Sequence, residues 1–257
     1  MTMLDIAIRA AREAGRILAE AYGQPHEIIV KGLRDITTEA DLEAEATTFR
    51  IIRENCPEAC FVSEELSNAH RDYGNLPTWY IDPLDGTTNF ARGLPGFSVS
   101  VAMAKRGVVQ CGAVYDPLTG QLFYAERGQG AYLNEKRLHV STRARLIDSA
   151  ALLDWPRDQE IRQVSARFLA RLVPLVDTVR SRGSAALGFC SIAAGWAEVY
   201  FQYTLSPWDV AAGALIVTEA GGRVTDLRGQ PYSLDEPSWL VTNGLVHEAV
   251  LAQKPFE

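Results

Sequence analysis

The chain has 257 residues, of which 47% are hydrophobic and 22% are charged, and its net charge is −7. This composition excludes a disordered chain and predicts one large domain or two lobes around a shared core. The acidic balance argues against a nucleic-acid-binding protein, and no apolar run is long enough to predict a membrane span.

Two amphipathic helices are predicted in the N-terminal region. Apolar residues recur at helical spacing over residues 4–21, and Gly23 ends the run. Acidic residues interrupt this helix where a signal peptide would be uniformly apolar, so we expect a cytoplasmic protein. The second helix begins near Thr38 and stops before Pro57. The positions expected to face the core are Leu42, Ala46, Phe49 and Ile52.

The period then changes from helix to strand. Segments rich in Val, Tyr and Phe, separated by Gly, Pro and Asp, occupy residues 60–134 and predict an antiparallel sheet. Helices and strands alternate further on, with helices expected over residues 161–173 and 184–196. The stretch "SPWDVAAGALIVTEAGG" has the start and end signals of a helix, which places Asp209 in a first helical turn.

The cysteines and histidines suggest no metal site or catalytic nucleophile of their own. None of the cysteines forms a C-x-x-C pair, and the histidines show no H-E-x-x-H pattern. We therefore expect reduced thiols in or near the core at Cys56, Cys60, Cys111 and Cys190.

Two aspartates stand out in "WYIDPLDGTTNF", residues 79–90. Asp82 and Asp85 lie in Asp-Pro and Asp-Gly dipeptides, so a surface turn would explain them without any chemistry. Other acidic residues have similar structural explanations, because paired glutamates at a strand end are usually solvated and an aspartate in a first helical turn favours the helix dipole. These other residues are Asp41, Glu64, Glu65 and Asp209.

The residues after Asp85 favour a shared site. Gly86, Thr87, Thr88 and Asn89 would place backbone amides and hydroxyl groups in a turn or helix start that suits an anion such as phosphate. A phosphate beside several carboxylates requires divalent cations between them, because like charges repel. Magnesium prefers oxygen ligands and is commonly held by a few carboxylates together with substrate phosphate. The pattern therefore predicts a magnesium-dependent phosphate site.

Over nearly its whole length the chain resembles the inositol monophosphatase family of lithium-sensitive, magnesium-dependent phosphatases. The stretch "IDPLDGTTNF" is similar to the family's first signature and "SPWDVAAGALIVTEAGG" to its second, while "VSEE" and "KGLRDITTEAD" match two further metal-site segments in the expected order. The resemblance implies an α/β fold, a layered α-β-α-β-α sandwich that assembles as a homodimer. It also implies a single domain over residues 1–257, with lobes of about 1–145 and 146–257.

The resemblance further implies residue roles by motif position. Roughly two or three magnesium ions would be held by Glu64, Asp82, the Leu84 carbonyl, Asp85 and Asp209. Direct attack by water would involve Glu64, with Asp41 and Thr87 orienting the water. The substrate would contact the amides of Gly86 and Thr87 through its phosphate and Ser184, Ala185 and Gln202 through its alcohol, with Asp85 and Asp209 alongside. Lys31 and Glu65 would lie nearby.

Gln202 departs from the family pattern. Members that act on inositol phosphate commonly have a glutamate at this position, seven residues before the aspartate of the second signature. A glutamine can hydrogen-bond to a polyol but cannot ion-pair with a substrate amine. We therefore expect an inositol-1-monophosphatase-like hydrolase acting on inositol monophosphate or a similar polyol phosphate. Histidinol phosphate, fructose 1,6-bisphosphate and nucleotide phosphates are the alternative substrates, and a regulatory binding protein on this fold is the alternative function.

Overall fold

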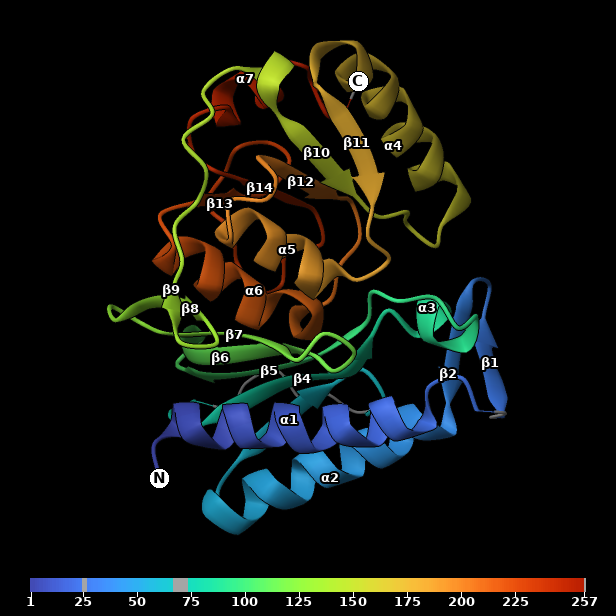
Figure 1. Ribbon diagram of the computed structural model, residues 1–257, viewed down its shortest axis with the longest axis vertical. Coiled ribbons are helices and arrows are strands. Elements are labelled where there is room, and N and C mark those ends of the chain that lie inside the picture. Colours follow the sequence, from blue (N-terminus) through green and yellow to red (C-terminus); the bar gives the residue numbers. More distant parts are fainter. Residues whose placement is uncertain (25–26, 67–73, 257) are drawn as a thin grey trace.

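The computed structural model describes residues 1–24, 27–66 and 74–256. Helices and sheets alternate in layers from the N-terminal helices to the C-terminal ones, which confirms the predicted α-β-α-β-α sandwich (Figure 1). The helices are α1 (Met3–Ala21), α2 (Glu39–Asn55), α3 (Thr87–Ala91), α4 (Gln159–Leu172), α5 (Ala185–Ala193), α6 (Pro207–Glu219) and α7 (His247–Leu251), with 3₁₀ turns at Leu146–Asp148 and Val173–Leu175.

The first sheet is seven-stranded and follows the chain order. Its strands are β3 (Cys60–Ser63), β4 (Thr78–Asp85), β5 (Ser98–Lys105), β6 (Val108–Asp116), β7 (Gln121–Glu126), β8 (Gly130–Leu133) and β9 (Lys136–Arg137). Every neighbouring pair is antiparallel except β3 and β4, which run parallel. The antiparallel sheet predicted from the strand and turn pattern is therefore confirmed, apart from this one edge.

The second sheet is five-stranded and mixed. In spatial order its strands are β11 (Thr178–Ser181), β10 (Ala150–Leu153), β12 (Val199–Gln202), β14 (Trp239–Thr242) and β13 (Arg223–Thr225). Strands β10, β11 and β12 are parallel to one another, whereas β14 is antiparallel to both of its neighbours. The carboxyl ends of β10, β11 and β12 therefore lie at one edge of this sheet, which leads toward the candidate site.

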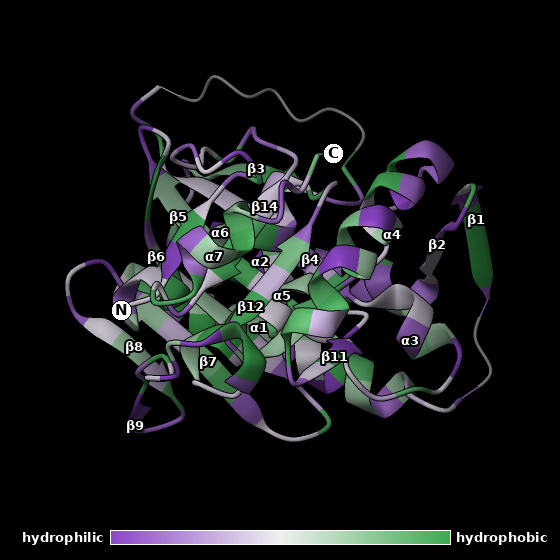
Figure 2. Cartoon of the chain, turned by 90° about the horizontal axis from the view of Figure 1, so that it is seen from above, coloured by the Kyte–Doolittle hydropathy of each residue, from purple (hydrophilic) through white to green (hydrophobic). Residues whose placement is uncertain are grey.

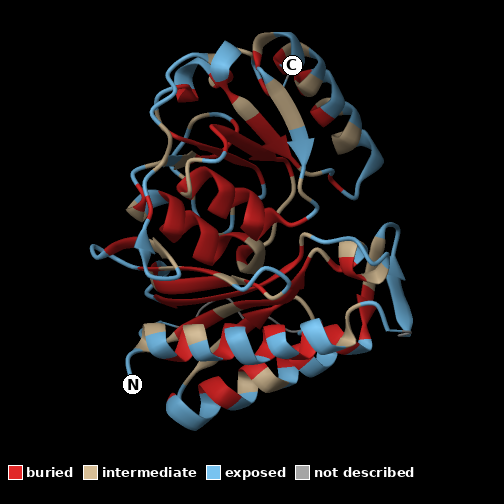
Figure 3. Cartoon of the chain, in the orientation of Figure 1, coloured by how far each residue is buried: buried red, intermediate tan, exposed pale blue. Residues whose placement is uncertain are grey.

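Helices α5 and α6 fill the space between the two sheets; every residue of α5 is buried, and so is most of α6 (Figure 3). Small residues let them approach their neighbours closely. A Cβ atom at Gly112 would lie 2.8 Å from the Cα atom of Ala212, and one at Gly213 would lie 2.7 Å from Cβ of Phe189. This tight packing fixes the start of α6 relative to the first sheet, which matters because Asp209 lies in that first turn.

Helices α1 and α2 cover the outer face of the first sheet (Figure 1). The predicted inner face of α2 is partly wrong, because Leu42 and Ala46 are exposed. The helix instead turns Asp41 and Glu45 inward, and Ser63 Oγ donates a hydrogen bond of 2.5 Å to Glu45 Oε1. The prediction was wrong because it followed the apolar residues of α2 and placed its acidic residues on the solvent side. All four cysteines are free thiols, and Cys56, Cys111 and Cys190 are buried, as expected.

A two-stranded hairpin stands apart from both sheets. It consists of β1 (Ile28–Gly32) and β2 (Asp35–Thr38), which pair antiparallel. Every residue of β1 is exposed, and Figure 2 shows it as a largely hydrophobic strand at the edge of the molecule. Within the described part of the chain, none of the helices has the length and apolar character needed to cross a membrane.

Candidate active site

Strand β4 carries Asp82 and Asp85 into the interior of the protein. Its pairing with β5 shifts register between these two residues, an irregularity of the kind that re-aims side chains. Asp82 is 1% exposed and Asp85 is 8% exposed, so the explanation of this stretch as a solvated surface turn is wrong. Carboxylates buried to this extent need hydrogen bonds or a charge partner.

The stretch after β4 is fixed by contacts with two other segments. Gly86 precedes α3 in a left-handed conformation, and a Cβ atom there would lie 2.9 Å from the Gly183 carbonyl oxygen and 3.0 Å from that of Gly96. Only glycine fits such a position. Asn89 joins the same segments, because its Nδ2 donates to the Gly96 carbonyl at 2.7 Å and to the Arg182 carbonyl at 3.0 Å.

The carboxylate of Asp85 lies against the start of α5. It accepts hydrogen bonds from Ser184 Oγ at 2.6 Å, from the Ala185 amide at 3.1 Å and from the Ala186 amide at 2.7 Å. A predicted magnesium ligand thus contacts two residues of the predicted alcohol pocket. Burial raises the pKa of Asp85 to about 7, although the hydrogen bonds from Ser184 and Ala186 oppose the rise.

Asp209 reaches the same region from the first turn of α6. It forms a capping box with Ser206, whose backbone amide donates to Asp209 Oδ2 at 2.7 Å. Burial, together with the charges of Glu64 and Asp85, raises the pKa of Asp209 to about 8. The side chains of Asp82 and Asp209 are in hydrogen-bond contact, and burial and its acidic neighbours raise the pKa of Asp82 as well. Two such carboxylates share a proton unless a cation takes its place.

Asp41 and Thr87 meet although they are far apart in the sequence. Thr87 Oγ1 lies 3.2 Å from Asp41 Oδ1 and 3.0 Å from the Leu84 carbonyl oxygen. The other carboxylate oxygen of Asp41 accepts from the amide and hydroxyl of Thr38, which is the N-cap of α2. Burial raises the pKa of Asp41 to about 6.

Glu64 and Glu65 follow the end of β3 and face the cations of neighbouring segments. Lys31 Nζ lies 2.9 Å from Glu65 Oε1 and 3.7 Å from Glu64 Oε1. Burial raises the pKa of Glu64, while the charges of Lys31 and Arg157 oppose that rise. The charge of Glu64 also raises the pKa values of Asp82 and Asp209. We refer to Glu64, Asp82, Asp85 and Asp209 together as the carboxylate group.

Residues 1–255 match the sequence pattern of the inositol monophosphatase family. The chain belongs to the inositol monophosphatase family. This membership supports phosphatase activity, and it agrees with the resemblance found in the two signature stretches.

Individual family members match along most of the chain. The Nus factor SuhB of Pasteurella multocida is 40% identical over 230 residues, which cover 88% of this chain and 86% of that protein. The inositol-1-monophosphatase of Mesorhizobium japonicum is 36% identical over 261 residues, covering 99% and 97%. The solved structure of an IMPase of Thermotoga maritima has a TM-score of 0.91 at 34% identity, covering 98% of this chain and 96% of that one.

Two residues that contact this family site were not predicted. Asp154 follows β10 and accepts hydrogen bonds from the Gly183 amide at 2.5 Å and from Ser181 Oγ at 3.0 Å, so it holds the segment that leads into Ser184. Arg157 Nη2 lies 3.3 Å from Glu64 Oε1. The available signal was the polar sequence "DWPR" directly after a strand, since loops at strand ends often carry functional residues.

Gln202 ends β12 inside the protein and is 4% exposed. Its Oε1 accepts a hydrogen bond of 2.7 Å from the backbone amide of Tyr203. The oxygen of the side-chain amide is therefore already hydrogen-bonded to the backbone of the next residue. Contact between Gln202 and a substrate alcohol stays a prediction.

The donor set of the site suits magnesium. Among residues 1–24, 27–66 and 74–256, no three His, Cys, Asp or Glu side chains converge as tightly as around a bound ion. Some oxygens are already engaged, since Asp85 and Asp209 accept from helix-start amides and Asp82 accepts from the Leu84 amide at 3.0 Å. The group nevertheless consists of oxygen donors, which magnesium prefers, and a divalent cation would offset the burial and the neighbouring negative charges that raise the pKa values of Asp82 and Asp209.

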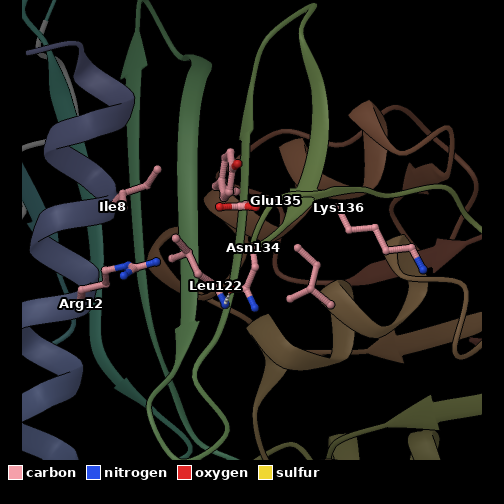
Figure 4. Close-up of a pocket in the computed structure, with 8 residues that line it drawn as sticks. Ile8, Arg12, Leu122, Asn134, Glu135 and Lys136 are labelled. Atoms are coloured by element: carbon pink, nitrogen blue, oxygen red, sulfur yellow. Dashed lines mark hydrogen bonds between the residues drawn. The ribbon is translucent and has the colours of Figure 1, made fainter.

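A separate surface hollow of about 660 Å³ lies between α1 and the β7–β9 region (Figure 4). Its lining includes Arg12 of α1 and Asn134 and Lys136 near the end of the first sheet. None of the predicted site residues lines it. The carboxylate group, and not this hollow, is therefore the candidate active site.

Proposed function

We propose that this family member is a magnesium-dependent phosphomonoesterase that hydrolyses inositol monophosphate or a similar polyol phosphate to the alcohol and phosphate. One observation supports this most: the Asp41–Thr87 pair lies beside the stretch of β4 that carries the buried Asp82 and Asp85, and Asp82 in turn contacts Asp209 of α6. A hydroxyl and a carboxylate suit the orientation of water, and the carboxylate group suits divalent cations.

Asp41 and Thr87 would orient the attacking water. The Thr87 hydroxyl has one proton for either of its acceptors, Asp41 or the Leu84 carbonyl, and its lone pairs can accept a hydrogen bond from water. With a pKa of about 6, Asp41 is mostly ionised at neutral pH and can accept a proton from that water.

The carboxylates and the phosphate-binding turn would hold the other reactants. Magnesium would be held by Glu64, Asp82, the Leu84 carbonyl, Asp85 and Asp209. When bound, it would lower the pKa of water and offset charge on the phosphate and the leaving oxygen. The amides of Gly86 and Thr87 would bind phosphate oxygens. The water oxygen forms a bond to phosphorus, the bond from phosphorus to the alcohol oxygen breaks, and the alcohol leaves with a proton.

The family likeness supports further proposals of the same kind. We propose roughly two or three magnesium ions per site, inhibition by lithium, a cytoplasmic homodimer and a single domain with two lobes. A regulatory binding role on this fold is the second candidate function, favoured by the similarity to the Nus factor SuhB of Pasteurella multocida. It becomes the better interpretation if no phosphomonoester is hydrolysed.

Phosphate release from a panel of substrates tests the proposed function. The panel contains inositol monophosphate, histidinol phosphate, fructose 1,6-bisphosphate, a nucleoside monophosphate and an aryl phosphate, each with magnesium and with excess chelator. We expect turnover only with magnesium, and opposition by calcium, because calcium prefers longer and looser coordination. Full turnover in chelator would contradict the magnesium role.

Gln202→Glu tests the substrate class separately. If Gln202 meets the alcohol, the neutral amide should favour inositol phosphate over histidinol phosphate, which carries an ammonium group. The charged variant should change the ratio of kcat/KM between these substrates by about tenfold, or about 1.4 kcal/mol. The aryl phosphate is the control and should be hydrolysed as before. An unchanged ratio would remove Gln202 from the pocket.

A further inference from the structure

Residue 157 joins three parts of the protein at the edge of the candidate site. It lies in the loop between β10 and α4, whereas its contacts come from the β1–β2 hairpin and from the segment after β3. Arg34, at the hairpin turn, donates from Nη1 to the carbonyl oxygen of Arg157 at 2.7 Å. Arg157 Nη1 lies 3.1 Å from Asp35 Oδ1, and its Nη2 lies 3.3 Å from Glu64 Oε1.

These contacts, which we call the hairpin clasp (Arg34, Asp35, Glu64 and Arg157), end on the same arginine. The hairpin is otherwise exposed along β1 and pairs with neither sheet. The planar guanidinium can address two carboxylates at once, which a lysine ammonium does less well. One arginine thus ties the hairpin both to the loop after β10 and to a predicted magnesium ligand.

The clasp also places positive charge beside Glu64, which affects how a cation can bind there. Arg157 faces Glu64, and the negative charge of Asp209 also acts on it. Lys31 supplies another cation, with its Nζ 3.7 Å from the same Oε1 atom of Glu64. A magnesium ion held by Glu64 would therefore bind against the positive charge of these side chains.

We propose that Arg157 is a positioning residue that holds the β1–β2 hairpin at the site and competes electrostatically with magnesium for the carboxylate group. This inference rests on the proposed magnesium-dependent function. It assigns Arg157 no contact with the reacting atoms. Loss of the arginine should loosen the hairpin and tighten magnesium binding. If Arg157 were needed only for local structure, its loss would loosen the hairpin and weaken magnesium binding as well.

Two variants separate the charge from the geometry. Arg157→Gln removes the charge and both carboxylate contacts, while Arg157→Lys keeps the charge but cannot reach two carboxylates in the same way. Arg145→Gln is the matched control, because Arg145 is an exposed arginine of the same half of the chain whose ion pair is with Asp148. The Arg34 contact to the carbonyl of residue 157 is available in every variant.

The first measurement is calorimetric titration of magnesium without substrate. We expect Arg157→Gln to lower the half-saturating magnesium concentration by about fivefold, and Arg157→Lys and Arg145→Gln to stay within about twofold of the wild type. Unchanged or weaker magnesium binding in Arg157→Gln would overturn the competition. If the wild type itself binds no magnesium, the proposed function fails.

The second measurement is limited trypsin digestion of the metal-free protein, with cleavage after Arg34 followed by mass spectrometry. We expect cleavage several-fold faster in Arg157→Gln, an intermediate rate in Arg157→Lys and the wild-type rate in Arg145→Gln. Equal cleavage rates in all proteins would overturn the role of Arg157 in holding the hairpin. This result needs no magnesium, so it decides the clasp separately from the proposed function.

Discussion

The starts of α2 and α6 use the same local motif for different purposes. Each helix begins with a capping box, Thr38 with Asp41 and Ser206 with Asp209, and in each the Oδ2 atom of the aspartate accepts from the cap amide. The surroundings differ. Asp41 meets a hydroxyl group, whereas Asp209 meets Asp82 and feels the charges of other carboxylates. The hydroxyl group beside Asp41 suits the orientation of a water molecule, whereas the carboxylates beside Asp209 suit the binding of a cation.

A third capping box, at the start of α1, shows what the motif does alone. Asp5 pairs with Thr2 in the same way, but its side chain is fully exposed. The hydrogen bonds from Thr2 lower the pKa of Asp5, whereas burial raises the pKa values of Asp41 and Asp209. Burial and neighbours, and not the motif, therefore decide the chemistry of these aspartates.

The largest effect should come from Asp209→Asn. Removing a carboxylate proposed to hold magnesium would forfeit several kcal/mol of charge stabilisation, which corresponds to a fall in kcat of about a hundredfold to a thousandfold. Without magnesium the variant should be at least as stable as the wild type, because like-charge repulsion falls. Asp85→Asn should lose activity alike but should be less stable, because both carboxylate oxygens accept hydrogen bonds at the start of α5 and an amide can replace only one of them. Kinetics, magnesium calorimetry and thermal unfolding check this, and near-normal rates in both variants would mean that the wrong carboxylates were chosen.

Asp41→Asn should have a smaller effect of a different kind. The amide can keep its oxygen for the Thr38 amide and turn its NH2 group to the Thr87 hydroxyl, but it cannot accept a proton from water, so we expect a fall in kcat of about tenfold to a hundredfold. Magnesium affinity should stay within about threefold of the wild type, since Asp41 is not one of the proposed magnesium ligands. A loss of magnesium binding equal to that of Asp209→Asn would erase the distinction between the two helix starts.

Stability should depend on pH in the metal-free protein and much less in the magnesium-bound protein. Asp85 and Asp209 have pKa values of about 7 and 8 in the folded protein, above the ordinary aspartate value of 3.8. The folded state then binds more protons than the unfolded state, so stability falls as pH rises through this range. We expect the metal-free protein to melt several degrees lower at pH 8.5 than at pH 7.

Saturating magnesium is the internal control for this pH effect. The ions should displace the shared protons, so the stabilisation by magnesium should grow between pH 7 and pH 8.5. This range lies above the region where neutral, buried His247, with a pKa of about 4, makes stability fall with falling pH. A metal-free melting temperature that rises with pH would contradict the raised pKa values.

The smallest effect should come from Asp5→Asn. This change removes the charged partner of the exposed capping box in α1, so the free energy of unfolding should fall only slightly. Activity and magnesium affinity should be unchanged. A large loss of activity would mean that the capping boxes differ less than their surroundings indicate.

Much of the fold followed from local patterns, whereas the contacts of the site did not. The strand and helix periods predicted most elements, and the stretch from Ser206 placed Asp209 in a first turn. The acid-lined inner face of α2 was missed, because Glu45 is buried only through its partner Ser63. Arg157 was missed for the same reason: its contacts join segments that are distant in the sequence, and no local period reports them.

Asn89 has a consequence for how the site can move. Its single amide group lies within hydrogen-bond distance of the carbonyls of Pro95, Gly96 and Arg182. The turn after Asp85 and the segment that leads into α5 are therefore coupled and should fluctuate as one body. The β1–β2 hairpin has one hydrogen bond of this kind, from Arg34 to the Arg157 carbonyl, and is otherwise held largely by ion pairs that salt screens. Amide hydrogen exchange should thus accelerate with ionic strength more in the hairpin than at the start of α5.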